Sequence, residues 1–355
     1  MTALLTDSSM PLTVPGLAGE FDVRPGYLAA ATCGVAPRRA VAALQADLEL
    51  WRGGLADPGG YDGVVARTRA SYAAVAAVAA ERVAIGSQTS ALVATIAASL
   101  PEGSEVLVAA GDFTSIVHPF LASGRLRVRE APLAELAGAV TRRTALVAFS
   151  LVQSATGEVA DADAVAAAAR ACGAATLVDL TQAAGVLPVE AGRFDATVCH
   201  AYKWLCAPRG VAFLTLSPGF AARLRPVAAG WYAGRDPWDS IYGTRMDLAA
   251  DARRFDVSPA WQAFVGAEVS IGLFAAADVP AIWQHASSLG AMACRVLGVP
   301  EQRRAIVTLP DPDGSRLARL ATVGIRASGR AGRLRLAFHV WNTADDVAAV
   351  AAALA

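Results

Sequence analysis

Short apolar runs alternate with alanine-rich helical patterns between Val83 and Leu216. Runs such as Thr144–Val152 and Ala175–Leu180 are apolar almost throughout, and not only at every second position. Strands of this composition are buried on both faces, as in a sheet that helices cover on both sides. The alternation of strand and helix is typical of repeated βαβ units. The pattern therefore predicts an α/β fold with a doubly wound, mostly parallel sheet, whose ligands lie beyond the carboxyl ends of the strands.

The length of the chain, together with a helical stretch and an αβ tail that follow this segment, predicts two domains. The predicted strands are Glu105–Ala110, Leu126–Ala131, Thr144–Val152, Ala175–Leu180, Ala196–Cys199 and Gly210–Leu216. The predicted helical stretches are Pro37–Trp51, Tyr61–Ala80, Gln88–Leu100, Asp161–Cys172 and Trp261–Leu297. A chain of 355 residues is near the limit for one hydrophobic core. We therefore expect a large domain over residues 1–258, including the N-terminal helices, and a smaller αβ domain over residues 259–355.

Composition argues against several classes of function. The chain has 31 basic and 31 acidic residues, so its net charge is 0 and no basic surplus exists for a nucleic-acid backbone. No apolar run reaches the roughly 18 residues of a membrane-spanning helix. Met1–Pro15 lacks the pattern of a secretory signal, and the five cysteines lack the CxxC spacing of a metal site. We expect a cytoplasmic protein with no metal and no nucleic-acid or membrane partner.

The basic residues are very unevenly divided. Of the 31, 30 are arginine and one, Lys203, is lysine. Arginine stays protonated, whereas a desolvated lysine can lose its proton and attack a carbonyl to form an imine. Lys203 is therefore a candidate for amine chemistry, with a chance remnant of a replaced lysine population as the alternative.

A carboxylate is expected close to this lysine. Asp179 ends the run Thr176-Leu177-Val178-Asp179, where a buried, unpaired charge is costly. An ion pair or a helix cap is one interpretation. Lys203 follows 24 residues later, after the strand Ala196–Cys199, which brings it to a neighbouring strand end. A buried acid that can face a ring nitrogen and an imine-forming amine are the two essentials of pyridoxal phosphate chemistry.

The motifs around both residues carry a family resemblance. They are Asp179-Leu180-Thr181-Gln182-Ala183, Phe194-Asp195, Cys199-His200-Ala201-Tyr202-Lys203-Trp204-Leu205 and Pro208-Arg209-Gly210. This stretch resembles the class V (fold type I) pyridoxal-phosphate aminotransferases, which include cysteine desulfurases, isopenicillin epimerase-like proteins and kynureninases. Matching features follow in the family's order from about Tyr27 to Asn342. The resemblance implies pyridoxal phosphate as the cofactor.

Carried over position by position, the resemblance implies the roles of the residues around the ring. Lys203 would form the imine and later move the Cα proton, and Asp179 would keep the pyridinium nitrogen protonated. Gln182 would lie near the phenolic oxygen, and Phe113 would stack on the ring. Gln153 would lie near the imine. A core aromatic and a helix-surface amide are the ordinary alternatives for Phe113 and Gln182.

A second group of residues is implied at the cofactor phosphate. The turn Gly86-Ser87-Gln88-Thr89 ends a strand and opens a helix, so its amides and hydroxyls can receive a phosphate, although they also read as a helix cap. The implied contacts within one subunit are Ser87, Gln88, Thr89, His200 and Tyr202. Those implied to reach from a neighbouring subunit are Trp231 and Ser258. The resemblance thus implies a homodimer with a shared active site.

One arginine resembles the substrate anchor of the family. Arg335, in Leu334-Arg335-Leu336-Ala337-Phe338, matches the carboxy-terminal arginine that binds the substrate α-carboxylate. A planar guanidinium suits a bidentate contact to a carboxylate. Because the chain has 30 arginines, a surface ion pair is the alternative.

The expected reaction follows from matches and departures together. Residues 321–333 contain no cysteine, although desulfurases carry their nucleophile shortly before the arginine. Tyr202 resembles the kynureninase pattern, whereas Ser258 stands where kynureninases have asparagine. We expect an aminotransferase that acts on the α-amino group of an amino acid or small amine. A lyase with kynureninase-like β-cleavage or C–S elimination, and a non-catalytic member of the fold, remain alternatives. A nucleotide-binding protein is disfavoured because no P-loop lysine and no GxGxxG after a strand is present.

Overall fold

The computed structural model describes residues 11–355, so the first ten residues of the predicted large domain and most of Met1–Pro15 lie outside the described residues. Its central sheet contains β1 (Val83–Gly86), β2 (Glu105–Ala109), β3 (Arg127–Ala131), β4 (Thr144–Ser150), β5 (Ala175–Asp179), β6 (Ala196–His200) and β7 (Ala212–Leu216). The strand order is β1-β7-β6-β5-β4-β2-β3. Neighbouring strands from β6 to β3 are parallel, and β7 is antiparallel to both β6 and β1. The predicted α/β fold with a mostly parallel sheet is confirmed.

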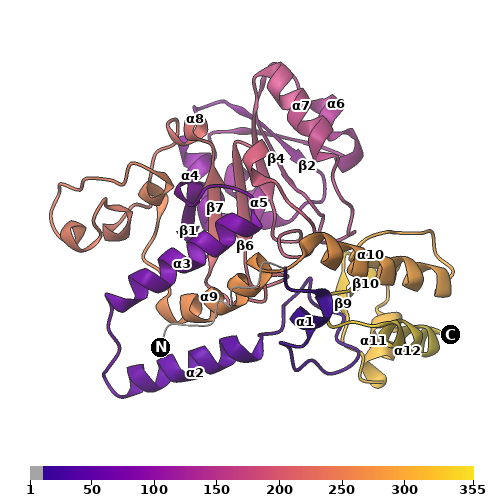
Figure 1. Ribbon diagram of the computed structural model, residues 1–355. Helices are drawn as coiled ribbons and strands as arrows, with labels where there is room; N and C mark the ends of the chain where they lie inside the picture. The colour runs from indigo at the N-terminus through magenta and orange to yellow at the C-terminus, as the bar shows by residue number, and fades with distance from the viewer. Residues whose placement is uncertain (1–10) are drawn as a thin grey trace.

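Helices cover both faces of this sheet (Figure 1). The α-helices within residues 11–275 are α1 (Val14–Ala18), α2 (Arg38–Arg52), α3 (Gly60–Val75), α4 (Thr89–Ser99), α5 (Thr114–Ala122), α6 (Leu136–Ala139), α7 (Ala162–Cys172), α8 (Pro218–Ala221) and α9 (Trp261–Ala275). On β2, Val106 and Val108 pack with α4 and α5, whereas Leu107 and Ala109 belong to the larger core that includes α3, α7 and α9. Successive strand residues therefore pack into cores on opposite faces of the sheet, which explains why the strands are apolar throughout.

A second, smaller sheet follows near the C-terminus. It has the order β8-β10-β9 and is antiparallel. Its strands are β8 (Ile306–Pro310), β9 (Ser328–Arg330) and β10 (Arg333–Ala337), and the helices beside it are α10 (Val279–Val296), α11 (Ser315–Thr322) and α12 (Ala344–Leu354). Figure 1 shows these elements grouped on one side of the molecule, with α1 next to them. The boundary between residues 258 and 259 stays a prediction, and α9, which follows it, packs along α2 and α3.

Two predicted helical stretches end differently in the structure. The prediction Tyr61–Ala80 is too long, because Ala77 has a φ of 52° and the Val78 amide donates to the Ala73 carbonyl at 3.0 Å. The left-handed Ala77 and the hydrogen bond from Val78 together form a Schellman-type helix end. The prediction Trp261–Leu297 is divided into α9 and α10. The Asp278 side chain accepts from the Ala281 amide at 3.0 Å and caps the start of α10.

The parallel strands bring polar residues to one edge. β4, β5 and β6 end at Ser150, Asp179 and His200, respectively. Ser150 pairs with Asp179 in the register of β4 and β5, so these ends lie side by side. Among residues 11–355, no helix combines the length and apolar character that crossing a bilayer requires.

Candidate active site

A small hollow lies at the carboxyl ends of β4, β5 and β6. Its lining contains one amine, one carboxylate, one imidazole and several hydroxyl groups. The residues are Thr89, Phe113, Ser115, Ser150, Ser154, Asp179, Thr181, Gln182, His200, Tyr202 and Lys203. Seven of the predicted site residues therefore meet here: Thr89, Phe113, Asp179, Gln182, His200, Tyr202 and Lys203.

Asp179 is held by the turn that follows its strand. One carboxylate oxygen accepts the Thr181 amide at 2.7 Å, and the residue is only 4% exposed. Burial raises the pKa of Asp179 to about 6, although the hydrogen bonds from Thr181 and the charge of Lys203 act in the opposite direction. Asp179 is thus an anion at neutral pH with limited solvation, which suits it to hold a proton on a partner.

Lys203 follows β6 in a turn and is 6% exposed. Its Nζ lies 5.3 Å from the centre of the Phe113 ring and 5.7 Å from that of Tyr202. Burial lowers the pKa of the Lys203 amine to about 8, and the positive charge of Arg335 lowers it further, whereas Asp179 raises it. At neutral pH this amine is still mostly protonated, but about a tenth of it is uncharged, far more than for a surface lysine with a pKa near 10.5.

His200 leaves a buried atom without a partner. Its Nε2 is buried and has no hydrogen bond among the described residues, and the ring packs edge-on against Tyr202 at 4.4 Å. Burial, together with the charges of Arg209 and Lys203, lowers the pKa of His200 to about 4. Of the buried side-chain atoms without a partner in residues 11–355, this is the one whose residue lines the hollow, so a ligand bound there can supply its hydrogen bond. Pyridoxal phosphate fits the donor set, with Lys203 for its aldehyde, Asp179 for its ring nitrogen and hydroxyl groups for its polar substituents.

The predicted phosphate turn begins at the edge strand β1. β1 ends at Gly86 and α4 begins at Thr89, as expected, and no side chain caps the first turn of α4. The amides there remain available to an anion. Thr89 lines the hollow, whereas Ser87 is half-buried, Gln88 is exposed, and neither lines it.

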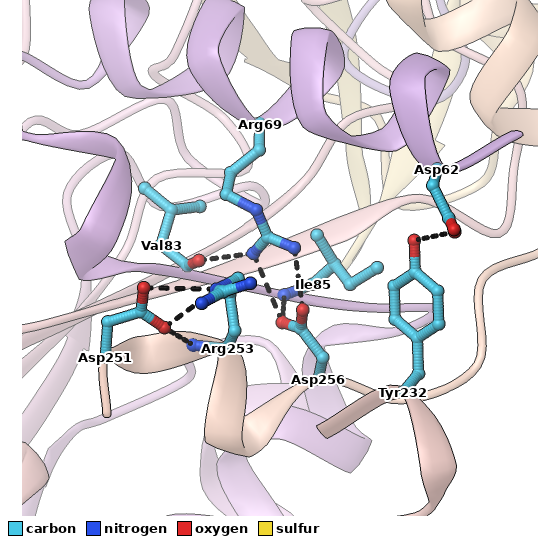
Figure 2. Close-up of polar contacts among 8 residues, drawn as sticks. All are labelled: Asp62, Arg69, Val83, Ile85, Tyr232, Asp251, Arg253 and Asp256. Carbon is cyan, nitrogen blue, oxygen red and sulfur yellow. Dashed lines mark hydrogen bonds and ion pairs between the residues drawn. The ribbon is translucent and has the colours of Figure 1, made fainter. Parts of the chain in front are cut away.

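A buried ion pair holds β1 in place (Figure 2). Arg69 on α3 and Asp256 lie 2.6 Å apart and are nearly inaccessible. The Asp256 carboxylate accepts the Ile85 amide at 2.8 Å, and Arg69 donates to the Val83 carbonyl. Because β1 is an edge strand, these side chains take the place of a missing neighbouring strand.

Phe113 lies at the open side of the hollow and is 46% exposed. Its amide donates to Asp112 at 2.7 Å, and the same carboxylate accepts the Ser150 amide and hydroxyl at 2.7 and 2.6 Å. Asp112 therefore fixes the Phe113 backbone to the end of β4. Burial raises the pKa of Asp112, against the hydrogen bonds from Ser150 and Phe113.

Arg335 lies beside the hollow on β10 and is fully buried. Its guanidinium donates to Ser328 Oγ at 3.0 Å, to Thr32 Oγ1 at 2.7 Å and to the Ser154 carbonyl. None of the acidic residues in the described chain forms an ion pair with it. The surface ion pair considered above is therefore absent. Burial, followed by the charge of Arg330, lowers the pKa of Arg335 to about 10.

Three further predicted residues do not line the hollow. Gln153 donates to the Ala110 carbonyl at 3.0 Å. Trp231 packs on Trp238 with 5.2 Å between ring centres, and Ser258 is exposed. The segment of Trp231 is fastened to α3, because the Tyr232 hydroxyl donates to Asp62 at 3.0 Å (Figure 2).

Four lining residues were missed by sequence reasoning: Ser115, Ser150, Ser154 and Thr181. Ser150 ends β4 just as Asp179 ends β5, so the strand-end rule could have identified it. Thr181 supports both neighbours: its amide bonds Asp179, and its Oγ1 accepts the His200 amide at 3.0 Å. No pattern in the sequence distinguishes Ser115 or Ser154 from surface serines.

Part of the chain is similar to curated proteins that are named as enzymes. Isopenicillin N epimerase of Streptomyces clavuligerus is 36% identical over 129 residues, covering 33% of this chain and 32% of that protein. Kynureninase of Deinococcus radiodurans is 29% identical over 234 residues, covering 63% and 57% of the two chains. The chain therefore matches less than two thirds of the length of these relatives.

Whole-chain similarity appears among solved structures. The cystine C–S lyase C-DES, in complex with cysteine persulfide, has a TM-score of 0.83 at 20% identity, with 96% of this chain and 98% of that chain covered. At this identity the likeness concerns the fold. The family model described as aminotransferase class-V matches residues 82–350. The chain belongs to the aminotransferase class-V family, and pyridoxal phosphate is its cofactor.

Proposed function

We propose that this protein acts at the α-amino group of an amino acid or small amine, with transamination as its reaction. One observation carries the proposal: Lys203 and Asp179 line one hollow, together with the unsatisfied Nε2 of His200. When bound, pyridoxal phosphate supplies an electron sink that makes the Cα proton of an amino acid removable.

The proton transfers are assigned to the two buried ionisable groups. Lys203 Nζ has a pKa of about 8, so its uncharged form can take a proton from Cα and return it to another atom nearby. Asp179, with a pKa of about 6, is ionised at neutral pH and would hold a proton on the ring nitrogen of the bound cofactor. The lowered pKa of Lys203 makes a proton acceptor available, and the raised pKa of Asp179 still lies below neutral pH, so an acceptor and an anion are present at the same pH.

Arg335 is proposed to bind the substrate carboxylate. It is a buried cation that has only neutral hydrogen-bond partners within the described chain. A buried charge without a counter-ion is costly, and a carboxylate would supply the missing charge. This supports an amino acid over a simple amine as the substrate.

A lyase reaction is the second candidate. It is supported by the relatives, since the kynureninase match covers 63% of this chain. Both reactions begin with the same proton removal by Lys203, and they differ in which bond changes next. The side chains of the hollow do not distinguish them.

We also propose that two copies of the chain form the active unit. Ser258 and Trp231 lie outside the hollow of their own subunit, which supports a role toward a second one. A shallow hollow of about 850 Å³ between α4 and α5 shares Ser115 with the site and offers surface for that second copy. Light scattering should give twice the 36.4 kDa chain mass. A fully active monomer would overturn this part of the proposal.

Cofactor attachment is tested by reduction with borohydride in the presence of pyridoxal phosphate. Because Lys203 is the only lysine, a modified lysine identifies the position without ambiguity. Lys203→Arg keeps the charge and should lose the attachment. Arg303→Lys adds a lysine where the side chain is 81% exposed and measures nonspecific labelling. Labelling of both lysines to the same extent would contradict the proposal.

The reaction is tested with a panel of amino acids. A transaminase should convert the bound cofactor to its amine form without an added keto acid. A lyase should instead release pyruvate, alanine or sulfide. If no amino acid changes the cofactor spectrum, a non-catalytic role replaces both.

A further inference from the structure

Resting on the proposed function, we infer that Trp204 is a positioning residue that orients the Gln182 amide with a free N–H toward the cofactor. Trp204 directly follows Lys203 and is 1% exposed. Its indole Nε1 donates to Gln182 Oε1 at 2.7 Å. The residue beside the reactive amine therefore controls a different side chain of the same hollow.

The contacts on Gln182 admit only one orientation of its amide. Opposite the indole, Gln182 Nε2 donates to the Ala31 carbonyl at 3.0 Å. The indole N–H can only donate and the backbone carbonyl can only accept, so a flipped amide would lose both hydrogen bonds. Within the described residues, the second hydrogen of Nε2 has no protein acceptor. Gln182 lines the hollow, so it presents a hydrogen-bond donor there.

Trp204 is itself held from behind. His339 is completely buried, and its Nδ1 accepts the Val340 amide at 2.7 Å. The remaining proton therefore lies on Nε2, which donates to the Trp204 carbonyl at 3.0 Å. Burial lowers the pKa of His339 to about 4, so the ring stays neutral and keeps this tautomer near neutral pH. The contacts that hold Gln182 thus run from His339, just after β10, through Trp204 to the Gln182 amide.

The predicted effect is electrostatic. The family resemblance implies that Gln182 would lie near the phenolic oxygen of the cofactor, where a donor would stabilise negative charge on that oxygen. The oxygen carries more charge once the proton of the lysine–cofactor linkage has left. A correctly oriented Gln182 therefore lowers the pKa of this linkage. Without the indole N–H, the amide can rotate and the pKa should rise.

The test is a pH titration of the visible absorption of the bound cofactor, without substrate. Trp204→Phe should raise the midpoint by roughly 0.5–1 pH unit, the equivalent of one neutral hydrogen bond. Gln182→Leu should raise it at least as much. If Trp204 acts through Gln182, the double variant should match Gln182→Leu alone. Additive shifts, or an unchanged midpoint in Trp204→Phe, would overturn the inference.

Trp341→Phe is the matched control. Trp341 stacks on His339 with 4.3 Å between ring centres, but its Nε1 donates to the Tyr27 carbonyl at 3.3 Å and not to Gln182. Loss of packing in this aromatic cluster is therefore common to both variants. The midpoint should stay at the wild-type value in Trp341→Phe.

Two further measurements separate the outcomes. Should Trp204→Phe fail to fold, benzothienylalanine in place of Trp204 keeps the ring size and removes only the N–H. In cofactor-free protein, the side-chain amide hydrogens of Gln182 should exchange faster with solvent when Trp204 is replaced by Phe or by benzothienylalanine than in the wild type. Failure of wild-type protein to attach the cofactor would contradict the proposed function. Normal attachment with an unchanged midpoint would contradict the role of Trp204 alone.

Discussion

Two buried carboxylates, Asp256 and Asp179, differ in whether a positively charged side chain is paired with them. Asp256 is paired with Arg69 at 2.6 Å, and the pair also satisfies the backbone of β1. Asp179 forms no ion pair within the described chain, although Lys203 lines the same hollow. Burial raises the pKa of both carboxylates to about 6. A shifted pKa therefore does not distinguish a structural acid from a chemical one.

The contacts make the distinction. In the Arg69–Asp256 pair, which we call a closed pair, both groups form hydrogen bonds with each other and with the backbone of β1. At Asp179 the neighbouring His200 Nε2 is unsatisfied, and the Lys203 amine has no hydrogen bond among the described residues. Buried charges that are completely paired stabilise one conformation. Buried charges without a partner lower the free energy of unfolding and remain available to bind a ligand.

Lys203→Met should abolish the reaction and leave the cofactor-free fold intact. Losing the group that moves the proton costs roughly 10²–10⁴-fold in kcat. Because Met removes a desolvated amine that lacks a partner, the free energy of unfolding should not fall. Steady-state kinetics and urea unfolding measure the two quantities. A large loss of stability would show that Lys203 also holds the fold together.

Arg69→Met should lower the stability of the fold, which Lys203→Met should not. It leaves Asp256 buried and unpaired, so the free energy of unfolding should fall by about 3–5 kcal/mol. Replacing both residues by apolar ones should recover most of that loss. Arg303→Met breaks an exposed pair with Glu301 and should change stability by less than about 1 kcal/mol in urea unfolding. Equal losses in Arg69→Met and in this control would contradict the closed-pair interpretation.

The stability of cofactor-free protein should rise with pH between about 8 and 10.5. The folded-state pKa of Lys203 is lowered to about 8 from 10.5, so only the unfolded chain holds this proton in that window. Stability rises wherever the unfolded state binds more protons, here on the order of 1–3 kcal/mol. Urea unfolding of wild type and Lys203→Met at both ends of the window isolates the effect. A wild-type slope no steeper than that of the variant would refute it.

Arg335→Lys should weaken substrate binding while keeping the charge. The loss of a bidentate contact costs about 1.4 kcal/mol, or tenfold in KM, with a smaller change in kcat. Arg330→Lys is the control on the same hairpin, because Arg330 is exposed. An equal KM change in both variants would assign the effect to general charge.

Sequence reasoning was most successful where chemistry and position coincide. Asp179 and Lys203 were found because strand ends and a solitary lysine are visible in a linear pattern, and the structure brings both to one hollow. Thr181 was missed because its hydroxyl group accepts the amide of His200 at the end of a different strand, a contact that forms only when β5 and β6 lie side by side. The early end of α3 at Val75 was missed because an alanine in the left-handed conformation has no signal in composition.

The alternation of strands and helices, the polar residues at strand ends and the single lysine can all be read from the linear chain. These are local properties of apolar periodicity and side-chain chemistry. The antiparallel direction of β7, the pairing of Arg69 with Asp256 across 187 residues and the hydrogen bond from Trp204 to Gln182 follow from the folded arrangement. Such contacts join distant parts of the chain, and their geometry depends on how the two cores pack around the sheet.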